Sequence, residues 1–128
     1  MIYLDTSVVL ARILVEDRRP PTPLWDESLF SSRLLEYEVW VTLNARELHQ
    51  SHGKAASALL NRVTLVELRP EVLERALEPF PAPVRTLDAL HLASIEFLRS
   101  RQQEVELASY DERLAVAACA LGIPLVAL

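Results

Sequence analysis

Glycine and cysteine are nearly absent from this sequence, which holds two glycines and one cysteine in 128 residues. Two glycines are too few for the glycine-rich loops that bind nucleotide phosphates, so the Walker and dinucleotide-binding types of site are excluded. The single cysteine, Cys119, excludes an intramolecular disulfide, which fits a reducing cytoplasm. Because it lies in an apolar run, we expect it to be a small buried residue.

Long apolar runs are also missing. The most apolar stretch, residues 114–128, is broken by Gly122 and Pro124 and is too short to cross a bilayer. The amino terminus has no basic region, and Asp5 interrupts its only apolar run. We therefore expect no secretory signal, no contact with a membrane and a cytoplasmic location.

Basic residues are fewer than acidic ones, 13 against 18, which gives a net charge of −5. Taken alone, this balance argues against a general nucleic-acid binder, because phosphates are bound mainly by lysine and arginine. Lys54 is the only lysine, however, and the other 12 basic residues are arginine. The arginine fork suits both phosphates and carboxylates, so RNA or a charged partner protein stays open.

The chain does contain enough apolar material for one globular domain over residues 1–128. Apolar residues make up 51% and charged residues 24% of the sequence, as in ordinary domains with a core of their own. The pattern predicts strands at 2–4, 28–31, 63–68, 105–108 and 123–128, and helices at 8–14, 33–50, 54–62, 71–78, 87–101 and 112–121. Gly53 is expected to interrupt the long helix. Strands that alternate with helices imply an α/β fold with a parallel sheet covered on both faces.

Three aspartates follow strands or begin helices. Asp5 follows the first predicted strand, Asp111 follows the strand that ends near residue 108, and Asp88 lies in the first turn of a helix. Parallel α/β sheets bind ligands at the carboxyl ends of their strands, so all three are expected to reach one edge. Each of them taken singly is explained equally well as a helix cap.

Glu38 is harder to explain as a solvated charge. Its neighbours at three and four residues are Leu34, Leu35, Val41 and Thr42. Glu38 therefore lies on an apolar stripe of its helix, while Glu36 lies about 200° around and is expected in solvent. Buried acids are rare unless they are paired or bind metal. The alternative to a metal role is an ion pair with an arginine from another element.

Four carboxylates at one edge would repel one another. At about 5 Å and an effective dielectric constant near 20, each pair costs roughly 3 kcal/mol, against a total stability of about 5–15 kcal/mol. Either some acids keep a proton or a cation neutralises them. Ligation by oxygen alone suits Mg²⁺ or Mn²⁺, and such metals activate water for attack on a phosphodiester. The residues thus predict metal-assisted phosphodiester hydrolysis.

Four motifs of the chain resemble the PIN-domain family and, within it, the VapC-type toxin ribonucleases of toxin–antitoxin pairs. In chain order they are Ile2-Tyr3-Leu4-Asp5-Thr6-Ser7, Glu38-Val39, Leu87-Asp88-Ala89-Leu90-His91-Leu92-Ala93 and Tyr110-Asp111-Glu112-Arg113-Leu114. The resemblance spans nearly the whole chain. It implies a three-layer α/β/α fold with a five-stranded parallel sheet.

The resemblance also implies an activity, which is Mg²⁺- or Mn²⁺-dependent cleavage of single-stranded or loop RNA under the control of a cognate antitoxin. Asp5 and Asp88 would be the firmest metal ligands, and Asp111 would support a second metal or orient water. Glu38 would help to position the attacking water. VapC-like proteins commonly pair through their helices, so a homodimer is expected.

Residues close to these motifs are expected to assist. Thr6, Ser7 and Ser109 would supply hydrogen bonds to the acids, and Ser109 stands where the family often has threonine. Arg85 is a candidate phosphate contact, with a surface salt bridge as the alternative. His91 is expected chiefly as a structural histidine beneath the site, although its place on the helix also allows a hydrogen bond to a site carboxylate.

Other functions compete with the nuclease. A haloacid-dehalogenase-like phosphotransferase needs a second aspartate at position 7, where this chain has Ser7. A non-catalytic PIN-like module that binds RNA or protein has no reason to tolerate four repelling acids. A PIN-like nuclease that acts on DNA, or in RNA processing without an antitoxin, is compatible with the sequence.

Overall fold

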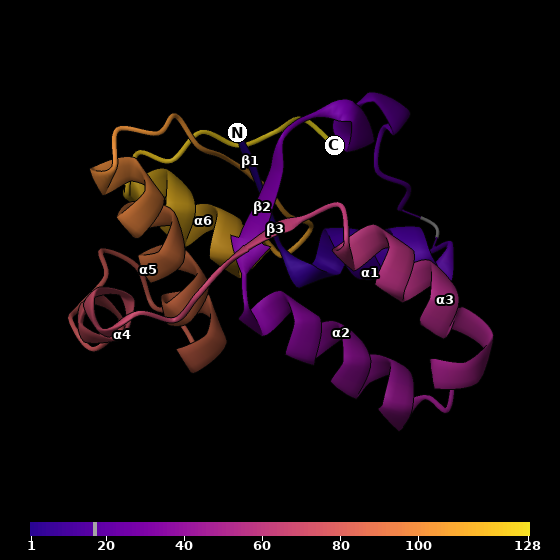
Figure 1. The fold of residues 1–128 in the computed structure, drawn as a ribbon. Helices are drawn as coiled ribbons and strands as arrows, with labels where there is room; N and C mark the ends of the chain where they lie inside the picture. The colour runs from indigo at the N-terminus through magenta and orange to yellow at the C-terminus, as the bar shows by residue number, and fades with distance from the viewer. Residues whose placement is uncertain (17) are drawn as a thin grey trace.

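The structure, a computed structural model, describes residues 1–16 and 18–128 and has the predicted three-layer α/β/α architecture (Figure 1). Its elements are β1 (Ile2–Leu4), α1 (Thr6–Leu14), the short 3₁₀ helix η1 (Thr22–Asp26), β2 (Leu29–Ser32), α2 (Leu34–Ala45), α3 (His49–Leu60), β3 (Thr64–Val66), α4 (Pro70–Ala76), α5 (Thr86–Ser100), β4 (Glu106–Ala108) and α6 (Glu112–Ala120). The described strands form one sheet in the order β3-β2-β1-β4, and every pairing is parallel. Helices α1, α2 and α3 lie on one side of the sheet, and α4, α5 and α6 lie on the other (Figure 1).

The central strand β1 contributes to both cores. Ile2 and Leu4 pack with apolar residues of α1, α2 and α3, while Tyr3 packs with those of α5 and α6. Successive side chains of a strand point to opposite faces of the sheet. A strand of three apolar residues can therefore be buried on both faces, and its carboxyl end delivers Asp5 to the edge of the sheet.

The expected fifth strand is wrong in its detail. Within the described residues, the segment 123–128 makes a single parallel bridge between Leu107 and Leu125. Two hydrogen bonds form it, from the Leu107 N–H to the Pro124 carbonyl at 2.8 Å and from the Val126 N–H to the Leu107 carbonyl at 2.9 Å. Proline has no N–H to donate to a ladder, which weakens strand pairing at this position. Among the described residues the sheet has four strands, and the α/β class holds.

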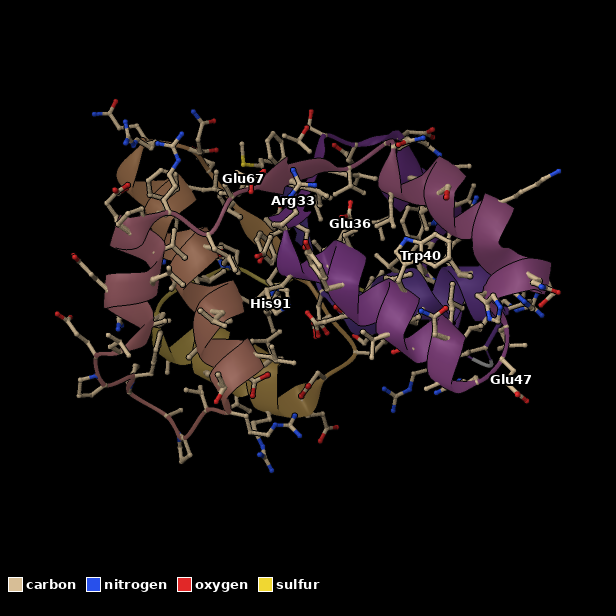
Figure 2. All side chains as sticks on the ribbon, turned by 60° about the horizontal axis from the view of Figure 1, so that its bottom comes forward. Arg33, Glu36, Trp40, Glu47, Glu67 and His91 are labelled. Atoms are coloured by element: carbon tan, nitrogen blue, oxygen red, sulfur yellow. The ribbon has the colours of Figure 1, made fainter. Side chains whose placement is uncertain are left out.

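The break in the long predicted helix is also placed differently. Instead of continuing to about residue 50, α2 ends at Ala45, and Glu47 adopts a left-handed conformation with a φ of 56°. Gly53 lies inside α3, where a Cβ atom would come within 3.3 Å of the Trp40 ring. Figure 2 shows Trp40 of α2 directed toward α3. The glycine thus permits close packing of two helices and does not end one.

The burial predicted for Cys119 is wrong, because this residue is exposed. Helix α6 buries Leu114, Ala117 and Ala118, whose spacing of three and four residues leaves Cys119 off the buried stripe. Among the described residues, no helix is long and apolar enough to cross a membrane.

Candidate active site

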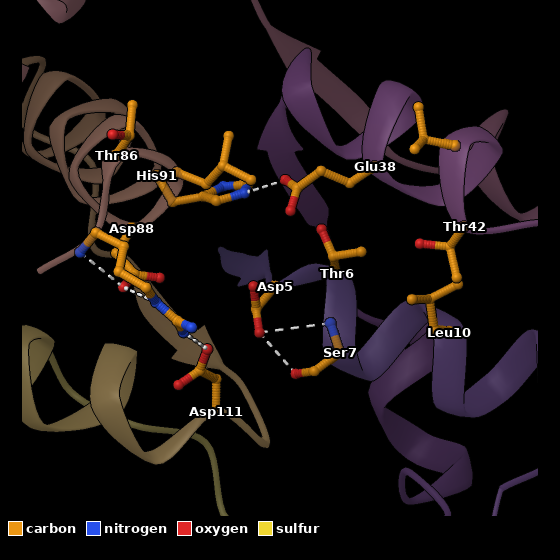
Figure 3. A pocket seen from close by; sticks show the side chains of 13 residues that line it. Asp5, Thr6, Ser7, Leu10, Glu38, Thr42, Thr86, Asp88, His91 and Asp111 are labelled. Atoms are coloured by element: carbon orange, nitrogen blue, oxygen red, sulfur yellow. Dashed lines mark hydrogen bonds and ion pairs between the residues drawn. The ribbon is translucent and has the colours of Figure 1, made fainter. Parts of the chain in front are cut away.

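A pocket of about 690 Å³ lies at the carboxyl end of β1, and four carboxylates line it (Figure 3). They are Asp5, Glu38, Asp88 and Asp111. Asp5 follows β1, Asp111 follows β4, Glu38 belongs to the helix that follows β2, and Asp88 lies in the first turn of α5. The structure therefore brings all four predicted site acids together. Parallel pairing is the reason, because it directs the ends of three strands to the same edge.

Asp5 is held by two serine hydroxyls. Its Oδ2 accepts hydrogen bonds from Ser7 Oγ at 2.6 Å and from Ser109 Oγ at 2.9 Å. The Ser7 hydroxyl accepts in turn from the Tyr110 N–H, and the Ser109 hydroxyl from the Asp111 N–H, both at 2.9 Å. These bonds join the turn after β1 to the turn after β4. They fix one oxygen of a carboxylate that is only 7% exposed and leave Oδ1 without a hydrogen bond to a described residue.

Thr6 behaves differently from the two serines. Its side chain lines the pocket and is buried, yet Oγ1 has no hydrogen-bond partner among the described residues. The structure thus shows no bond from Thr6 to any of the acids. Buried hydroxyl groups are normally paired, so an unpaired one in an acidic pocket marks a place where a polar ligand or water would bind.

Arg85 joins the other two aspartates. Its guanidinium lies 3.5 Å from Asp88 Oδ2 through Nε and 3.3 Å from Asp111 Oδ2 through a terminal nitrogen. Both aspartates also cap helices, as their positions allow. Asp88 Oδ2 accepts from the Arg85 backbone N–H at 3.1 Å, and Asp111 Oδ1 accepts from the N–H groups of Arg113 and Leu114 at 3.0 and 3.2 Å.

Glu38 is paired with a histidine rather than with an arginine. Its Oε1 lies 2.6 Å from His91 Nε2, and Oε2 has no hydrogen bond to a described residue. On the other side of the imidazole, Nδ1 lies 2.7 Å from the Tyr3 hydroxyl. Glu36 is only half-exposed, although its side chain is more exposed than that of Glu38, 40% against 21%, and it pairs at 3.4 Å with Arg33 of the same segment (Figure 2).

The pocket offers the oxygen ligands that a hard divalent cation prefers, but its described side chains are not arranged as a metal site. In the described part of the chain, no three histidine, cysteine or acidic side chains are arranged to hold a metal ion. The guanidinium of Arg85 stands between Asp88 and Asp111 and already supplies a positive charge. Asp5, Asp88 and Glu38 each keep one oxygen without a hydrogen bond to a described residue, and the Thr6 hydroxyl is unpaired. Free carboxylate oxygens are the ligands that Mg²⁺ and Mn²⁺ prefer.

Tyr3 was missed by the sequence argument. It lies in an apolar run, and its spacing indicates only a strand residue. Burial raises the pKa of the Tyr3 hydroxyl far above its usual value, and the neighbouring hydroxyls of Ser31 and Ser94 oppose that rise only partly. A buried phenol needs a hydrogen-bond partner, which for Tyr3 is the ring of His91. That need was the available signal, but the sequence does not reveal the partner.

The ranges over which the chain matches known proteins include every acid of this site. The family model described as PIN domain matches residues 2–119, a range that includes all four acids. Ribonuclease VapC35 of Mycobacterium tuberculosis is 29% identical over 137 residues, which cover 99% of this chain and 96% of the relative. Ribonuclease VapC46 of the same species is 31% identical over 132 residues, which cover 98% of this chain and 96% of the relative.

Proposed function

Because the chain belongs to the PIN-domain family, we propose that it is a metal-dependent endoribonuclease, the toxin of a VapBC-like toxin–antitoxin pair. The observation that carries the proposal is the pocket in which Asp5, Glu38, Asp88 and Asp111 meet. The relatives named as ribonucleases match the chain over nearly its full length. The substrate would be RNA, hydrolysed at its phosphodiester bonds.

Three aspartates would hold the metal, which would be Mg²⁺ or Mn²⁺. Asp5 and Asp88 are the most buried of the acids, each 7% exposed, and each has an oxygen free of protein hydrogen bonds. Asp111 would join them once Arg85 releases its Oδ2. When bound, such a metal polarises the phosphate and lowers the pKa of water.

The chain's own residues would do the remaining work. Ser7 and Ser109 keep Asp5 in one orientation through short hydrogen bonds. The free oxygen of Glu38 would orient the attacking water and accept its proton. Arg85 is 61% exposed at the rim, so it can turn from the aspartates to a phosphate of the RNA, whose charge its fork matches.

The first experiment measures cleavage of a single-stranded RNA by purified protein in Mg²⁺ or Mn²⁺. Asp5→Asn and Asp88→Asn keep the shape of the side chain and remove its charge, and we expect each to abolish detectable cleavage, as a chelator would. Glu106→Gln, an exposed acid on β4, is the matched control and should leave cleavage unchanged. Cleavage that persists in both aspartate variants contradicts the mechanism.

One observation favours a second candidate, a non-catalytic PIN-like module that binds RNA or protein. The acids are neutralised in part by Arg85, and no three metal-binding side chains are gathered in the described ranges. The same cleavage assay separates the two functions. A wild-type protein that binds single-stranded RNA but does not cut it in either metal would be such a module.

The partners we propose are a cognate antitoxin and a second copy of the chain. A small neighbouring gene that encodes a DNA-binding protein would support the antitoxin, and co-expression should then yield an inactive complex. Without such a gene, a role in RNA processing is favoured. Light scattering of the purified protein would give its mass, and we expect that of a homodimer.

A further inference from the structure

A chain of hydrogen bonds runs from the middle of the sheet to the pocket. The Tyr3 hydroxyl in β1 lies 2.7 Å from His91 Nδ1 in α5, and His91 Nε2 lies 2.6 Å from Glu38 Oε1 in α2. Tyr3 is 0% and His91 2% exposed, whereas the Glu38 side chain is 21% exposed. These hydrogen bonds thus begin in the core and end at a carboxylate in the pocket, and Figure 3 shows the last of them, between His91 and Glu38.

The direction of these bonds follows from what each group can offer. As a carboxylate, Glu38 only accepts hydrogen bonds, so its contact at 2.6 Å places a hydrogen on His91 Nε2. An imidazole with a single hydrogen then leaves Nδ1 as an acceptor, and the Tyr3 hydroxyl, which can donate, lies 2.7 Å from it. Tyr3 thus fits the histidine tautomer that Glu38 requires.

This arrangement also determines what Glu38 can do. His91 is the only described side chain that donates a hydrogen bond to Glu38. One carboxylate oxygen is fixed by that bond, and the other is left for the pocket. The position of Glu38 therefore depends on an imidazole that is packed against Tyr3 with the two rings edge to face, at 5.7 Å between their centroids.

We propose that Tyr3 and His91 are positioning residues for Glu38, an inference that rests on the proposed nuclease activity. They act through Glu38 and touch neither the metal nor the RNA. Residues that orient a catalytic group through hydrogen bonds typically change activity by about 10- to 100-fold when they are removed. Because Glu38 would act on water and not on RNA, the loss should be in kcat, with KM unchanged.

The kinetic test uses Tyr3→Phe, which removes one oxygen, and His91→Ala. We expect kcat to fall roughly 10-fold for Tyr3→Phe and up to about 100-fold for His91→Ala. Tyr37→Phe and His49→Ala are the matched controls, since both residues are exposed, Tyr37 on α2 and His49 at the start of α3, and neither lines the pocket. Unchanged kcat in Tyr3→Phe overturns the proposal. Thermal unfolding followed by circular dichroism verifies that each variant is folded, and Tyr3→Phe suffices if His91→Ala does not fold.

A double-mutant cycle separates positioning from a general structural effect. In a Glu38→Gln background, single-turnover cleavage should be no slower when Tyr3→Phe is added, because the residue that Tyr3 serves is already lost. A further loss equal to that in the wild-type background shows that Tyr3 acts independently of Glu38, and overturns the proposal.

The bonding itself is tested without any activity. Long-range ¹H–¹⁵N spectra of the metal-free protein report which ring nitrogen of each histidine carries hydrogen, and His91→Gln assigns the His91 signals. We expect hydrogen on Nε2 in the wild type and a shifted balance between the tautomers in Tyr3→Phe. An Nε2 without hydrogen overturns the proposal. If the wild type cleaves no RNA in either metal, the proposed function fails, while these spectra still decide the hydrogen-bond chain.

Discussion

At the scale of single residues, Arg85 places a positive charge beside two of the acids of the pocket. Its guanidinium contacts Asp88 and Asp111, yet its side chain is 61% exposed. Ion pairs as exposed as these contribute only about 0–1 kcal/mol each. Arg85 therefore offsets part of the repulsion between the acids, and under the proposed function a divalent cation would displace it at small cost.

Arg85→Ala tests that competition. Removing two exposed ion pairs worth about 1 kcal/mol together should raise the affinity of the free protein for Mn²⁺ by roughly fivefold. Isothermal titration without RNA measures the affinity. Arg46→Ala, an exposed arginine at the end of α2, is the control and should bind Mn²⁺ like the wild type. An equal or weaker affinity in Arg85→Ala would show that the guanidinium does not compete for the cation's place.

The sequence predicts the acids of the pocket better than it predicts their partners. Asp5 and Asp111 are placed by local rules, because each directly follows a strand and begins a helix. The partner of Glu38 is 53 residues away in the chain, and no local period links two helices that meet across a sheet edge. For Glu38 the sequence predicts either a metal role or an ion pair with arginine, and the structure pairs it with His91 instead of an arginine.

At the scale of elements, the helices show where sequence patterns are reliable. The helical pattern predicts a helix at 87–101, and α5 spans Thr86–Ser100, where its core face buries Leu92, Ile95 and Leu98. It does not locate the corner between α2 and α3, because Glu47 is neither glycine nor asparagine and yet has a positive φ of 56°. Gly53 is a misleading signal for the end of the helix, because it lies inside α3 and contacts Trp40 there.

Glu47→Gly should stabilise the corner. A left-handed conformation costs a residue with a side chain roughly 1–2 kcal/mol, and part of that gain is lost to the greater freedom of glycine in the unfolded chain. We expect the free energy of unfolding to rise by about 0.5–1 kcal/mol in urea denaturation. Glu47→Ala keeps the strain and is the control. Glu47 is exposed at the end of the molecule that carries the corner (Figure 2), so a decrease in stability in the glycine variant would contradict the strain argument.

At the scale of the whole molecule, the parallel sheet brings the acids to one edge. The net charge of −5 opposes the binding of a polyanionic substrate. A net negative charge does not attract RNA from a distance. Under the proposed function, RNA binding would depend on the divalent cation and on a few arginines, among which Arg85 lines the pocket.

The salt dependence of RNA binding reports the number of contacts between arginines and RNA phosphates. Each neutralised phosphate of a single strand contributes about −0.7 to the slope of log affinity against log salt concentration. In the Glu38→Gln protein, which keeps the three aspartates and should cut RNA too slowly to consume it during the titration, we expect a slope of roughly −1 to −2 at constant Mg²⁺. Adding Arg85→Ala should make the slope less steep by about 0.7, while adding Arg46→Ala should leave it unchanged. Fluorescence anisotropy of a labelled single-stranded RNA gives the slopes, and equal slopes with and without Arg85 would exclude this residue from contact with the phosphates.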